Sequence, residues 1–292
     1  MKVLKVLLGI IVVLALCVTG AYFYVKQDFP KFCENTVPIF AYHRVEPGHS
    51  DPYTMPPKDF EEQMKYLKEE LGYKTITLAE YVKGRKEGRT FHKECVLIFD
   101  DGYLDNLTYA APILKKYGYV GNMYMAVKYE GWPGYLDWHQ QHELLKFGWA
   151  IGSHTMNHKP LESMTPEQVD YELTKSMEHM RGIYNPPEGL TFSYPNGSSN
   201  KRIADQVRKA GYIAGVDGKV GVNGPDQDLM LLRRVNVFQN QPENIGCFQY
   251  DLKRAQILSY IDRTGLDSDK VLKLYYKVLV MIRGEQPEEE DE

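Results

Sequence analysis

Cysteine and net positive charge are both scarce in this sequence, and each shortage excludes a class of protein. The chain has 292 residues and four cysteines, Cys17, Cys33, Cys95 and Cys247, and no two of them have the close spacing of a CxxC metal or redox pair. Only Cys33 and Cys247 could pair as a disulfide, with two free thiols as the alternative. The formal net charge of −4 provides no basic surface for a nucleic-acid backbone. We therefore expect no nucleic-acid partner.

The sequence also lacks internal repeats and the compositional bias of a disordered chain. Hydrophobic residues make up 43% of the chain and aromatic residues 12%, which is enough to bury a substantial core. The last eight residues, EQPEEEDE at 285–292, are a run of like charge and are predicted to be a solvated, disordered tail. One large globular domain is the expected organisation.

The N-terminus contains an uncharged stretch of 20 residues, Val6–Val25, after two lysines. As a helix it would be about 30 Å long, the thickness of a bilayer core. It is longer than the apolar core of an ordinary signal peptide, so we predict an uncleaved membrane anchor at 1–27 and a linker at 28–36. The small residues at 18–21 keep cleavage and secretion open as the alternative. The preceding lysines predict that the rest of the chain lies outside the cell.

From residue 37 onwards, segments typical of strands alternate with segments typical of helices. Strands are predicted at 37–45, 73–78, 95–99, 121–127, 149–154, 190–195 and 213–216, and helices at 57–72, 78–88, 109–117, 138–147, 166–184 and 201–210. This order predicts an α/β domain with a parallel sheet or barrel and helices outside it. We place the domain at 37–250 and a C-terminal helical extension at 251–284, with a loop after residue 237 and an amphipathic helix at about 269–283.

The first candidate site residues are Asp100 and Asp101, which follow an apolar predicted strand in the stretch VLIFDDGYLDN. Functional sites of parallel α/β folds gather at the carboxyl ends of the strands. Neighbouring strand residues point to opposite faces, but Gly102 lets the backbone turn, so both carboxylates can face the same site. A helix cap or turn is the alternative for a lone Asp-Asp-Gly, and Asp105 is assigned to such a structural role.

A histidine pair gives these carboxylates a chemical partner. His154 and His158 lie four residues apart at the end of another predicted strand, where a single helical turn would bring both imidazoles to one ion. Unrelated surface or core histidines are the alternative. Two histidines and one carboxylate leave an open coordination position, as in catalytic zinc sites. The second carboxylate could then act on water held there.

Together, the motifs IFDDG, SHTMNH and FSYPNG resemble those of the polysaccharide deacetylases with the NodB homology domain, carbohydrate esterase family 4, over about residues 37–237. The resemblance implies a distorted (β/α) barrel and a hydrolase that removes N-acetyl groups from amino sugars, or O-acetyl groups in some relatives. By position, it implies Asp101, His154 and His158 as ligands of a divalent metal and Asp100 as the general base. These ligands suit zinc first, while cobalt, nickel and iron also fit them.

The resemblance also implies a binding site for the oxyanion and the substrate. It places the oxyanion-binding backbone N–H at the residue after Pro195, which is Asn196 in this sequence. Tyr194 beside it, Arg234 and Trp138 are the further candidates for this part of the site. Trp138 belongs to an aromatic-rich stretch at 129–138, and aromatic faces stack on sugar rings, although partly buried packing is the alternative.

The sequence departs from the family pattern at the general acid. The segment LLRRVNV lacks the histidine that usually stands near the C-terminal end of the domain, and the chain carries AYHRV upstream, as in permuted relatives similar to poly-N-acetylglucosamine deacetylases. We therefore predict His43 as the general acid, with strand capping as the alternative. Ser193 stands where many members have an arginine that orients the base. Arg233 or Arg234 is predicted to replace it, with an ordinary surface charge as the alternative.

Three functions are compatible with these residues. The leading hypothesis is a membrane-anchored, metal-dependent polysaccharide N-deacetylase outside the cell, acting on a poly-N-acetylglucosamine-like exopolysaccharide. A peptidoglycan or xylan deacetylase is the second, and a carbohydrate-binding protein without turnover is the third. The intact carboxylate and histidine motifs favour an enzyme over the third alternative.

Overall fold

The computed structural model describes residues 19–20, 22–48, 51–184, 186–238 and 244–283. Most of the predicted anchor and the predicted acidic tail lie outside these residues. The first described helix covers residues 22–34 and leads into the barrel. Within the described ranges, no helix is both long enough and apolar enough to span a bilayer.

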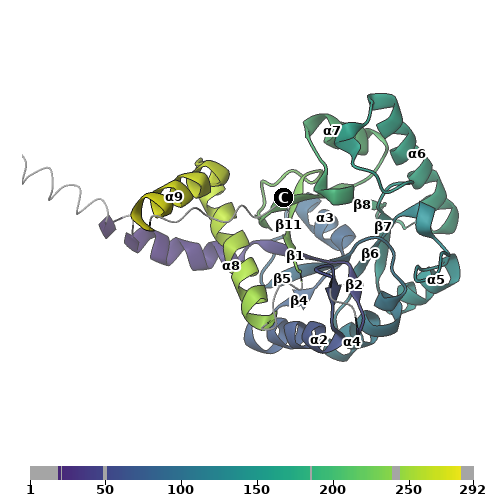
Figure 1. Cartoon of the computed structure of the whole chain (residues 1–292), viewed down its shortest axis with the longest axis horizontal. Coiled ribbons are helices and arrows are strands. Elements are labelled where there is room, and N and C mark those ends of the chain that lie inside the picture. Colours follow the sequence, from purple (N-terminus) through teal and green to yellow (C-terminus); the bar gives the residue numbers. More distant parts are fainter. Residues whose placement is uncertain (1–18, 21, 49–50, 185, 239–243, 284–292) are drawn as a thin grey trace, which may run out of the picture.

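Seven parallel strands form a closed barrel at the centre of the molecule (Figure 1). They are β1 (Val37–Tyr42), β5 (Glu94–Phe99), β6 (Asn122–Met125), β7 (Ala150–Ser153), β8 (Thr191–Ser193), β9 (Ala214–Val220) and β11 (Leu232–Asn236). Their order around the ring is β1-β11-β9-β8-β7-β6-β5, and β5 pairs with β1 to close it. The predicted (β/α) barrel is thereby confirmed.

Short strands complete the sheet at its margins. β10 (Val222–Asn223) pairs antiparallel with the start of β1, and β4 (Lys74–Thr75) pairs with the start of β5. β2 (Arg44–Val45) and β3 (Thr54–Met55) form a separate two-stranded sheet after β1. β10 and β4 thus lie at the starts of barrel strands, whereas the β2–β3 sheet follows the carboxyl end of β1.

Helices surround the barrel, and two more form an extension at one side (Figure 1). The surrounding helices are α2 (Pro57–Lys65), α3 (Leu78–Lys86), α4 (Ala111–Tyr117), α5 (Trp138–Lys146), α6 (Pro166–Ile183) and α7 (Lys201–Lys209), and the extension consists of α8 (Asn244–Arg263) and α9 (Ser268–Arg283). α2 continues as a π-helical turn at Tyr66–Glu70, and another at Asn106–Ala110 precedes α4. The predicted helices at 57–72 and 109–117 therefore exist, but each contains a wider turn.

The barrel strands are apolar because both of their faces are covered. All residues of β1 and β5 are buried. Ile39 and Ala41 share one cluster with Val96 and Ile98, whereas the alternate residue Phe40 belongs to the larger cluster that includes residues of the outer helices. The alternation separates a core that Leu78, Tyr81 and Val82 of α3 share with the inner strand residues from a larger core beneath the other helices.

Helix α8 was not predicted. The sequence indicated a loop after residue 237, but residues Asn244–Arg263 form a helix. Phe248, Leu252 and Ala255 are buried at helical spacing against the barrel. Tyr250 and Ile257 are exposed on the other side of the helix, so apolar residues occur all round it and blur the pattern. The predicted start of the extension at residue 251 consequently falls inside α8.

The first helix packs on α8. Asp28 accepts a hydrogen bond from the Tyr260 hydroxyl at 3.0 Å and forms an ion pair with Arg263 at 3.1 Å. Phe29 and Phe32 contact the Tyr260 ring edge to face, with centroids 5.2 and 5.3 Å away. The two ends of the described chain are thus joined beside the barrel.

The cysteines within the described ranges are free thiols. Cys33 on the first helix, Cys95 in β5 and Cys247 in α8 have no disulfide partner. Cys33 and Cys247 are therefore two free thiols and do not form the disulfide that the sequence left open.

Candidate metal centre and active site

Polar side chains from several strands gather at the carboxyl ends of the barrel. Asp100 follows β5, His154 follows β7, and Arg234 lies in β11. Parallel strands end on the same side of a barrel, so residues far apart in sequence can meet there. Asp100 and Arg234, 134 positions apart, are in direct contact.

The two aspartates reach one site because the backbone turns sharply after β5. Asp100 continues the inward alternation of the strand and is 1% exposed. Asp101 has a φ of 75° and Gly102 a φ of 88°, both in the left-handed region. A Cβ at Gly102 would lie 2.7 Å from Met125 Cε, so only glycine fits without displacement. The predicted turn is confirmed, and it begins one residue earlier, at Asp101.

His154 and His158 converge, although not through the predicted helical turn. The segment between them is an irregular loop, in which Thr155 has a φ of 70° and His158 a φ of 51°. The His158 N–H donates to Thr155 Oγ1 at 3.0 Å, and the two imidazole centroids are 4.9 Å apart. Left-handed backbone in non-glycine residues costs free energy and is concentrated at functional sites.

A buried glutamate from α6 holds this loop in place. Glu172 Oε2 accepts hydrogen bonds from the N–H groups of Met156 at 3.0 Å and Asn157 at 2.8 Å, and Glu172 Oε1 accepts one from Asn157 Nδ2 at 2.6 Å. Sequence reasoning missed Glu172, which in sequence is one of many glutamates on a helix.

Asp101, His154 and His158 present ligand atoms within 4.8 Å of one another. Asp101 Oδ1 lies 3.5 Å from His154 Nε2 and 2.9 Å from His158 Nε2. His154 Nδ1 lies 2.8 Å from the Ser193 carbonyl. Because a carbonyl only accepts, Nδ1 carries the proton and Nε2 keeps its lone pair for a metal.

These residues fit a divalent cation. Asp101 Oδ1 is buried and lies within 3.5 Å of both imidazole Nε2 atoms, so the three potential ligand atoms already face one another. Two imidazoles and a carboxylate form the donor set of catalytic zinc sites that keep one position open. The predicted ligand set is therefore assembled in space.

The charges of the three groups are coupled. Burial alone would raise the pKa of Asp101, but His158 and His154 beside it hold that pKa well below its usual range. Burial lowers the pKa of His154. Burial also works against protonation of His158, yet the Asp101 carboxylate outweighs it and raises the pKa of His158. An ionised Asp101 beside an unprotonated His154 is the state that binds a cation.

Asp100 is not part of this ligand group and is held by Arg234 instead. Arg234 NH1 donates to Asp100 Oδ2 at 2.9 Å, and the two side chains are 8% and 1% exposed. Asp100 Oδ1 is buried and has no hydrogen-bond partner among the described residues. One carboxylate oxygen is thus oriented by arginine, and the other can accept a proton.

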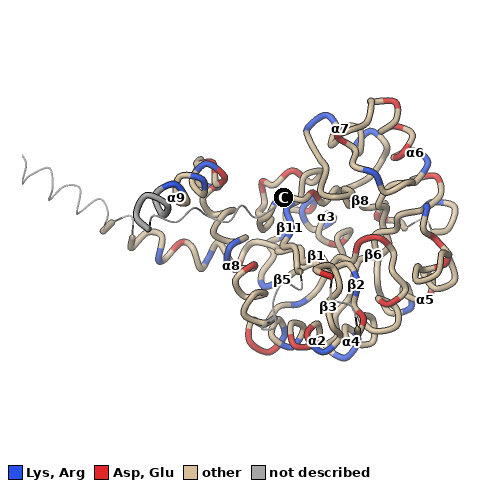
Figure 2. Tube along the Cα trace, viewed as in Figure 1, with Lys and Arg blue, Asp and Glu red and all other residues tan. Residues whose placement is uncertain are grey.

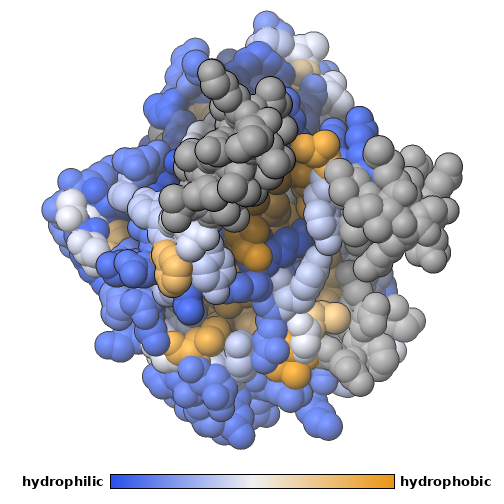
Figure 3. Space-filling model, turned by 90° about the vertical axis from the view of Figure 1, so that its left-hand side faces the viewer, coloured by the Kyte–Doolittle hydropathy of each residue, from blue (hydrophilic) through white to orange (hydrophobic). Residues whose placement is uncertain are grey.

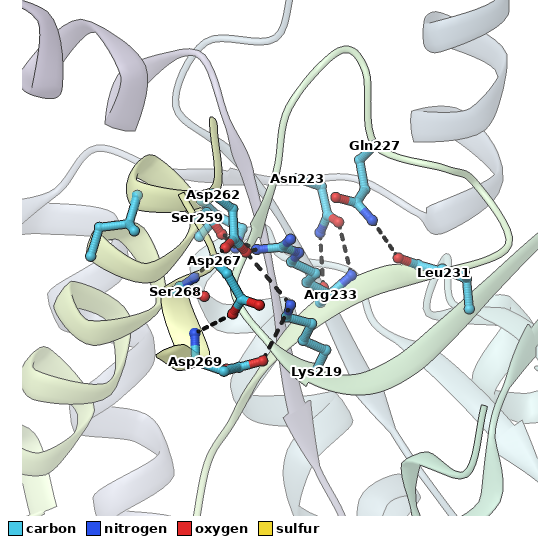
Figure 4. A network of polar contacts seen from close by, with 12 residues as sticks. Lys219, Asn223, Gln227, Leu231, Arg233, Ser259, Asp262, Asp267, Ser268 and Asp269 are labelled. Carbon is cyan, nitrogen blue, oxygen red and sulfur yellow. Dashed lines mark hydrogen bonds and ion pairs between the residues drawn. The ribbon is translucent and has the colours of Figure 1, made fainter. Parts of the chain in front are cut away.

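The neighbouring Arg233 points toward α8, where its side chain joins a polar network (Figure 4). Its NH1 forms an ion pair with Asp262 of α8 at 2.6 Å, and its backbone N–H and carbonyl bond the side chain of Asn223 at 2.9 and 2.8 Å. Lys219 Nζ reaches Asp262 at 3.6 Å and Asp269 at 3.7 Å. Of the two arginines proposed to replace the missing one, only Arg234 contacts Asp100.

His43 follows β1, and two side chains hold its backbone. Asn106 Nδ2 donates to the His43 carbonyl at 2.9 Å, and Asp105 Oδ1 accepts from the Val45 N–H at 2.7 Å. Asp105 has the structural role expected for it, but as an anchor for β2 and not as a helix cap. Nothing in the sequence indicated Asn106.

The His43 ring lies in the field of the two aspartates. Its Nδ1 is buried without a hydrogen-bond partner among the described residues. Burial lowers the pKa of His43, and Asp100 and Asp101 partly oppose this. The nearby rings of Tyr53 and Phe238 lie 5.0 and 6.4 Å away. His43 is thus a titratable group with a free ring nitrogen beside the aspartates.

The loop after β8 has an exposed tip and a buried base. Asn196 is exposed with a φ of 54°. Tyr194 is fully buried, and its hydroxyl donates to the Met230 carbonyl at 2.8 Å. The Tyr194 side chain therefore supports the loop from below, and the predicted substrate contact through it is not available.

An aromatic row beside His158 contains other residues than the predicted Trp138. Tyr129 lies 6.0 Å from the His158 ring centroid, stacks on Tyr135 at 5.0 Å and meets Trp132 at 5.3 Å. Trp138 is 52% exposed at the start of α5, where it stacks on His139. The rings next to the metal ligands thus come from 129–135.

Comparison with protein families gives one assignment that covers the site motifs. The family model described as polysaccharide deacetylase matches residues 87–215. The Bacillus subtilis protein YxkH, named for the same family, is 35% identical over 202 residues, which is 69% of this chain and 71% of that protein.

Other similar proteins extend over more of the chain. A poly-β-1,6-N-acetyl-D-glucosamine N-deacetylase of Staphylococcus aureus is 27% identical over 280 residues, covering 84% of this chain and 95% of that protein. Among solved structures, the Streptococcus pyogenes deacetylase PplD in complex with acetate has a TM-score of 0.66 at 24% identity, over 73% of this chain and 98% of that one. IcaB from Ammonifex degensii has a TM-score of 0.63 at 22% identity, over 75% and 97%. These two structures share the fold.

Proposed function

The chain belongs to the polysaccharide deacetylase family and is a hydrolase, and we propose that it removes N-acetyl groups from an N-acetylglucosamine polymer with a divalent metal as cofactor. The observation that carries this proposal is the separation of roles at one site. Asp101, His154 and His158 face one point, and Asp100 stands beside them, oriented by Arg234.

Each step of an amide hydrolysis has a matching residue at this site. When bound, a divalent cation supplies Lewis-acid polarisation of the acetyl carbonyl and of a water molecule. Asp100 Oδ1 takes the proton of the attacking water, while Arg234 holds the carboxylate in position through Oδ2. The backbone N–H of Asn196 stabilises the negative charge that develops on the acetyl oxygen. His43 donates a proton to the departing amine.

Zinc is the metal that we propose first. Two imidazoles and one carboxylate with an open position are typical of catalytic zinc. Cobalt, nickel and iron accept the same ligands, and availability selects among such ions.

The proposed substrate is a poly-N-acetylglucosamine-like exopolysaccharide. The S. aureus relative named for poly-β-1,6-N-acetyl-D-glucosamine is similar over 84% of this chain. In addition, His43 precedes the Asp pair in this chain, which is the order that the resemblance implies for the permuted relatives. In this aromatic row, Trp132 is 50% exposed and offers a ring to a sugar, while Tyr135 is stacked between Tyr103 and Tyr129 and supports the row.

A peptidoglycan substrate is the second candidate. The B. subtilis peptidoglycan-N-acetylmuramic acid deacetylase PdaA is 24% identical over 172 residues, which is 55% of this chain and 62% of that protein. A xylan deacetylase and a sugar-binding protein without turnover are further alternatives.

We further propose that the chain is held at the cell membrane by its N-terminal 1–27 segment, with the barrel outside the cell, or is secreted if that segment is cleaved. The uncharged run Val6–Val25 and the lysines before it support this location.

Acetate release from a panel of glycans tests the proposed function. The zinc-loaded protein should release acetate from β-1,6-linked N-acetylglucosamine oligomers faster than from peptidoglycan fragments or acetylated xylan. A His43→Ala variant should keep its bound zinc and lose most turnover, since metal binding does not need this side chain. Retained binding of the oligomers without acetate release from any of these glycans would contradict the enzyme proposal.

A further inference from the structure

Large apolar side chains are exposed together at the end of the molecule that carries the first helix and the extension. They are Tyr22, Phe23, Tyr24, Val25, Leu266, Leu274, Tyr275 and Tyr276, and we name them the stalk surface. Their exposed fractions run from 40% at Tyr276 to 63% at Leu274. Figure 3 looks onto this end and shows apolar groups among hydrophilic ones. Exposed apolar groups at this density mark an interaction surface.

The two parts of the stalk surface are fixed to the same support. The first helix packs on α8 through Asp28, Tyr260 and Arg263, and α9 follows α8 and packs against it. On α9, Asp269 turns its carboxylate to Lys219 of the barrel. The acidic side chain of the first turn thus faces the barrel and not the stalk surface.

Basic residues lie on the first helix and on α9 (Figure 2), and Lys26, Lys273 and Lys277 among them are exposed. Lys26 follows the aromatic residues of the first helix, and Lys273 and Lys277 flank Leu274, Tyr275 and Tyr276 on α9. An amphipathic helix with lysines beside Leu and Tyr is typical of segments that lie at the headgroup level of anionic membranes. The charge complements phosphate headgroups.

The position of the stalk surface in the chain agrees with a membrane. Tyr22–Val25 are the last residues of the uncharged run, so any bilayer that holds this run has its surface at these residues. Tyrosine and phenylalanine are favoured at that depth. α9 is carried on the same support, and its lysines would reach the headgroups from the side.

We propose that the stalk surface rests on anionic phospholipid, with α9 as a second membrane contact beside the N-terminal segment. The proposal rests on the membrane attachment proposed above and is independent of the deacetylase chemistry. Two contacts fix an orientation that one tether leaves free. β1 begins directly after the first helix, and the site lies beyond the other end of the strands. The active site would then face away from the lipid, toward glycan outside it.

Hydrogen exchange of α9 in the full chain tests the proposal. The protein is reconstituted in nanodiscs of phosphatidylcholine alone and of equimolar phosphatidylcholine and phosphatidylglycerol, and in detergent micelles. We expect the amides of residues 268–277 to exchange about tenfold more slowly on the discs with phosphatidylglycerol. The variants Lys273→Glu/Lys277→Glu and Leu274→Asp should remove this protection.

A matched control replaces exposed lysines of the barrel helices. Lys201→Glu/Lys209→Glu changes the same number of exposed charges on α7, which lies far from α9 (Figure 1), and should keep the protection of α9. Equal exchange of α9 in all three environments would overturn the proposal. Protection that rises with protein concentration and not with phosphatidylglycerol would overturn it as well, in favour of contact between copies of the chain. Acetate release from soluble oligomers is assayed separately, so failure of either proposal leaves the other intact.

Discussion

At the scale of single residues, Arg234 supports the active site because its hydrogen bond to Asp100 orients the proposed base. We expect Arg234→Ala to lower kcat by about 100-fold or more, since it leaves the buried Asp100 carboxylate without its partner. Bound zinc should stay unchanged because Asp101 and the histidines form the ligand set. Steady-state kinetics with metal analysis of the same samples measures both quantities.

Arg208 provides the matched control for this change. It is about half exposed and pairs with Asp205 and Asp228 on the surface, where ion pairs contribute little. Arg208→Ala should leave kcat within about twofold of the parent. Equal activity of the Arg234→Ala variant and this control would remove the assigned role of Arg234.

The raised pKa of Asp105 leads us to expect that the stability of the protein depends on pH. Burial raises its pKa to about 6, against the hydrogen bond from Val45 that lowers it. A carboxyl whose pKa is higher in the folded state binds more protons when folded, so its unfavourable contribution grows as pH rises from about 4 to about 6. Asp105→Asn keeps an acceptor for Val45 and removes this contribution. The variant should gain about 1–3 kcal/mol relative to the parent at pH 7, and little at pH 4.

Urea unfolding of parent and variant at a series of pH values measures this difference. A difference that stays constant between pH 4 and pH 7 would show that Asp105 does not titrate in this range.

The site residues fall into two groups: those that a short sequence motif identifies, and those whose role depends on contacts between distant segments. Asp100, Asp101, His154 and His158 lie in short motifs at strand ends, so the sequence predicted all four. Choosing Arg234 over Arg233 requires knowing which of two adjacent side chains of β11 points inward. Glu172, Asn106 and the anchoring contact of Asp105 act across the fold, between segments far apart in sequence, and no local pattern indicates them.

At the scale of elements, β11 links the extension to the active site. Arg233 binds Asp262 of α8 (Figure 4), and the next residue of the strand, Arg234, binds Asp100. Asp262→Ala should cost about 1–3 kcal/mol of stability and lower Tm by several degrees, since the pair is largely buried. Turnover should fall too, because β11 loses one of its supports.

Asp267 is the control for this region. It accepts hydrogen bonds from the N–H groups of Asp269 and Lys270 at the start of α9 and pairs with Lys270. Asp267→Ala should weaken α9 by about 1 kcal/mol and leave turnover unchanged. Loss of turnover to the same degree in both variants would indicate that the extension acts as a whole and not through Arg233.

The elements of the barrel were predictable because its strands are apolar on both faces and its helices have clear starts. Thr77 with Glu80, and Thr165 with Gln168, form capping boxes at α3 and α6. The same Thr77 ends the predicted strand at 73–78 early, leaving Lys74–Thr75 as β4. The closure of β5 onto β1 is a long-range pairing, which alternation alone does not specify.

At the scale of the whole molecule, the barrel separates the candidate metal centre from the proposed membrane contact. The first helix enters at the start of β1, and the candidate metal centre lies at the other end of the strands. The chemistry is thus placed away from the region where the chain is proposed to meet the membrane. This separation predicts that removal of contacts at the stalk surface changes location without changing the site.

The central claim is that Asp101, His154 and His158 hold a metal while Asp100 acts as the base. It is tested most directly by measuring bound zinc and acetate release on the same samples of the parent, Asp100→Asn and Asp101→Asn, after chelation and reloading with zinc. The account predicts that the parent binds zinc and releases acetate, that Asp100→Asn binds zinc as the parent does and releases almost none, and that Asp101→Asn loses both. Acetate release by Asp100→Asn at the rate of the parent would contradict it, as would full zinc binding by Asp101→Asn.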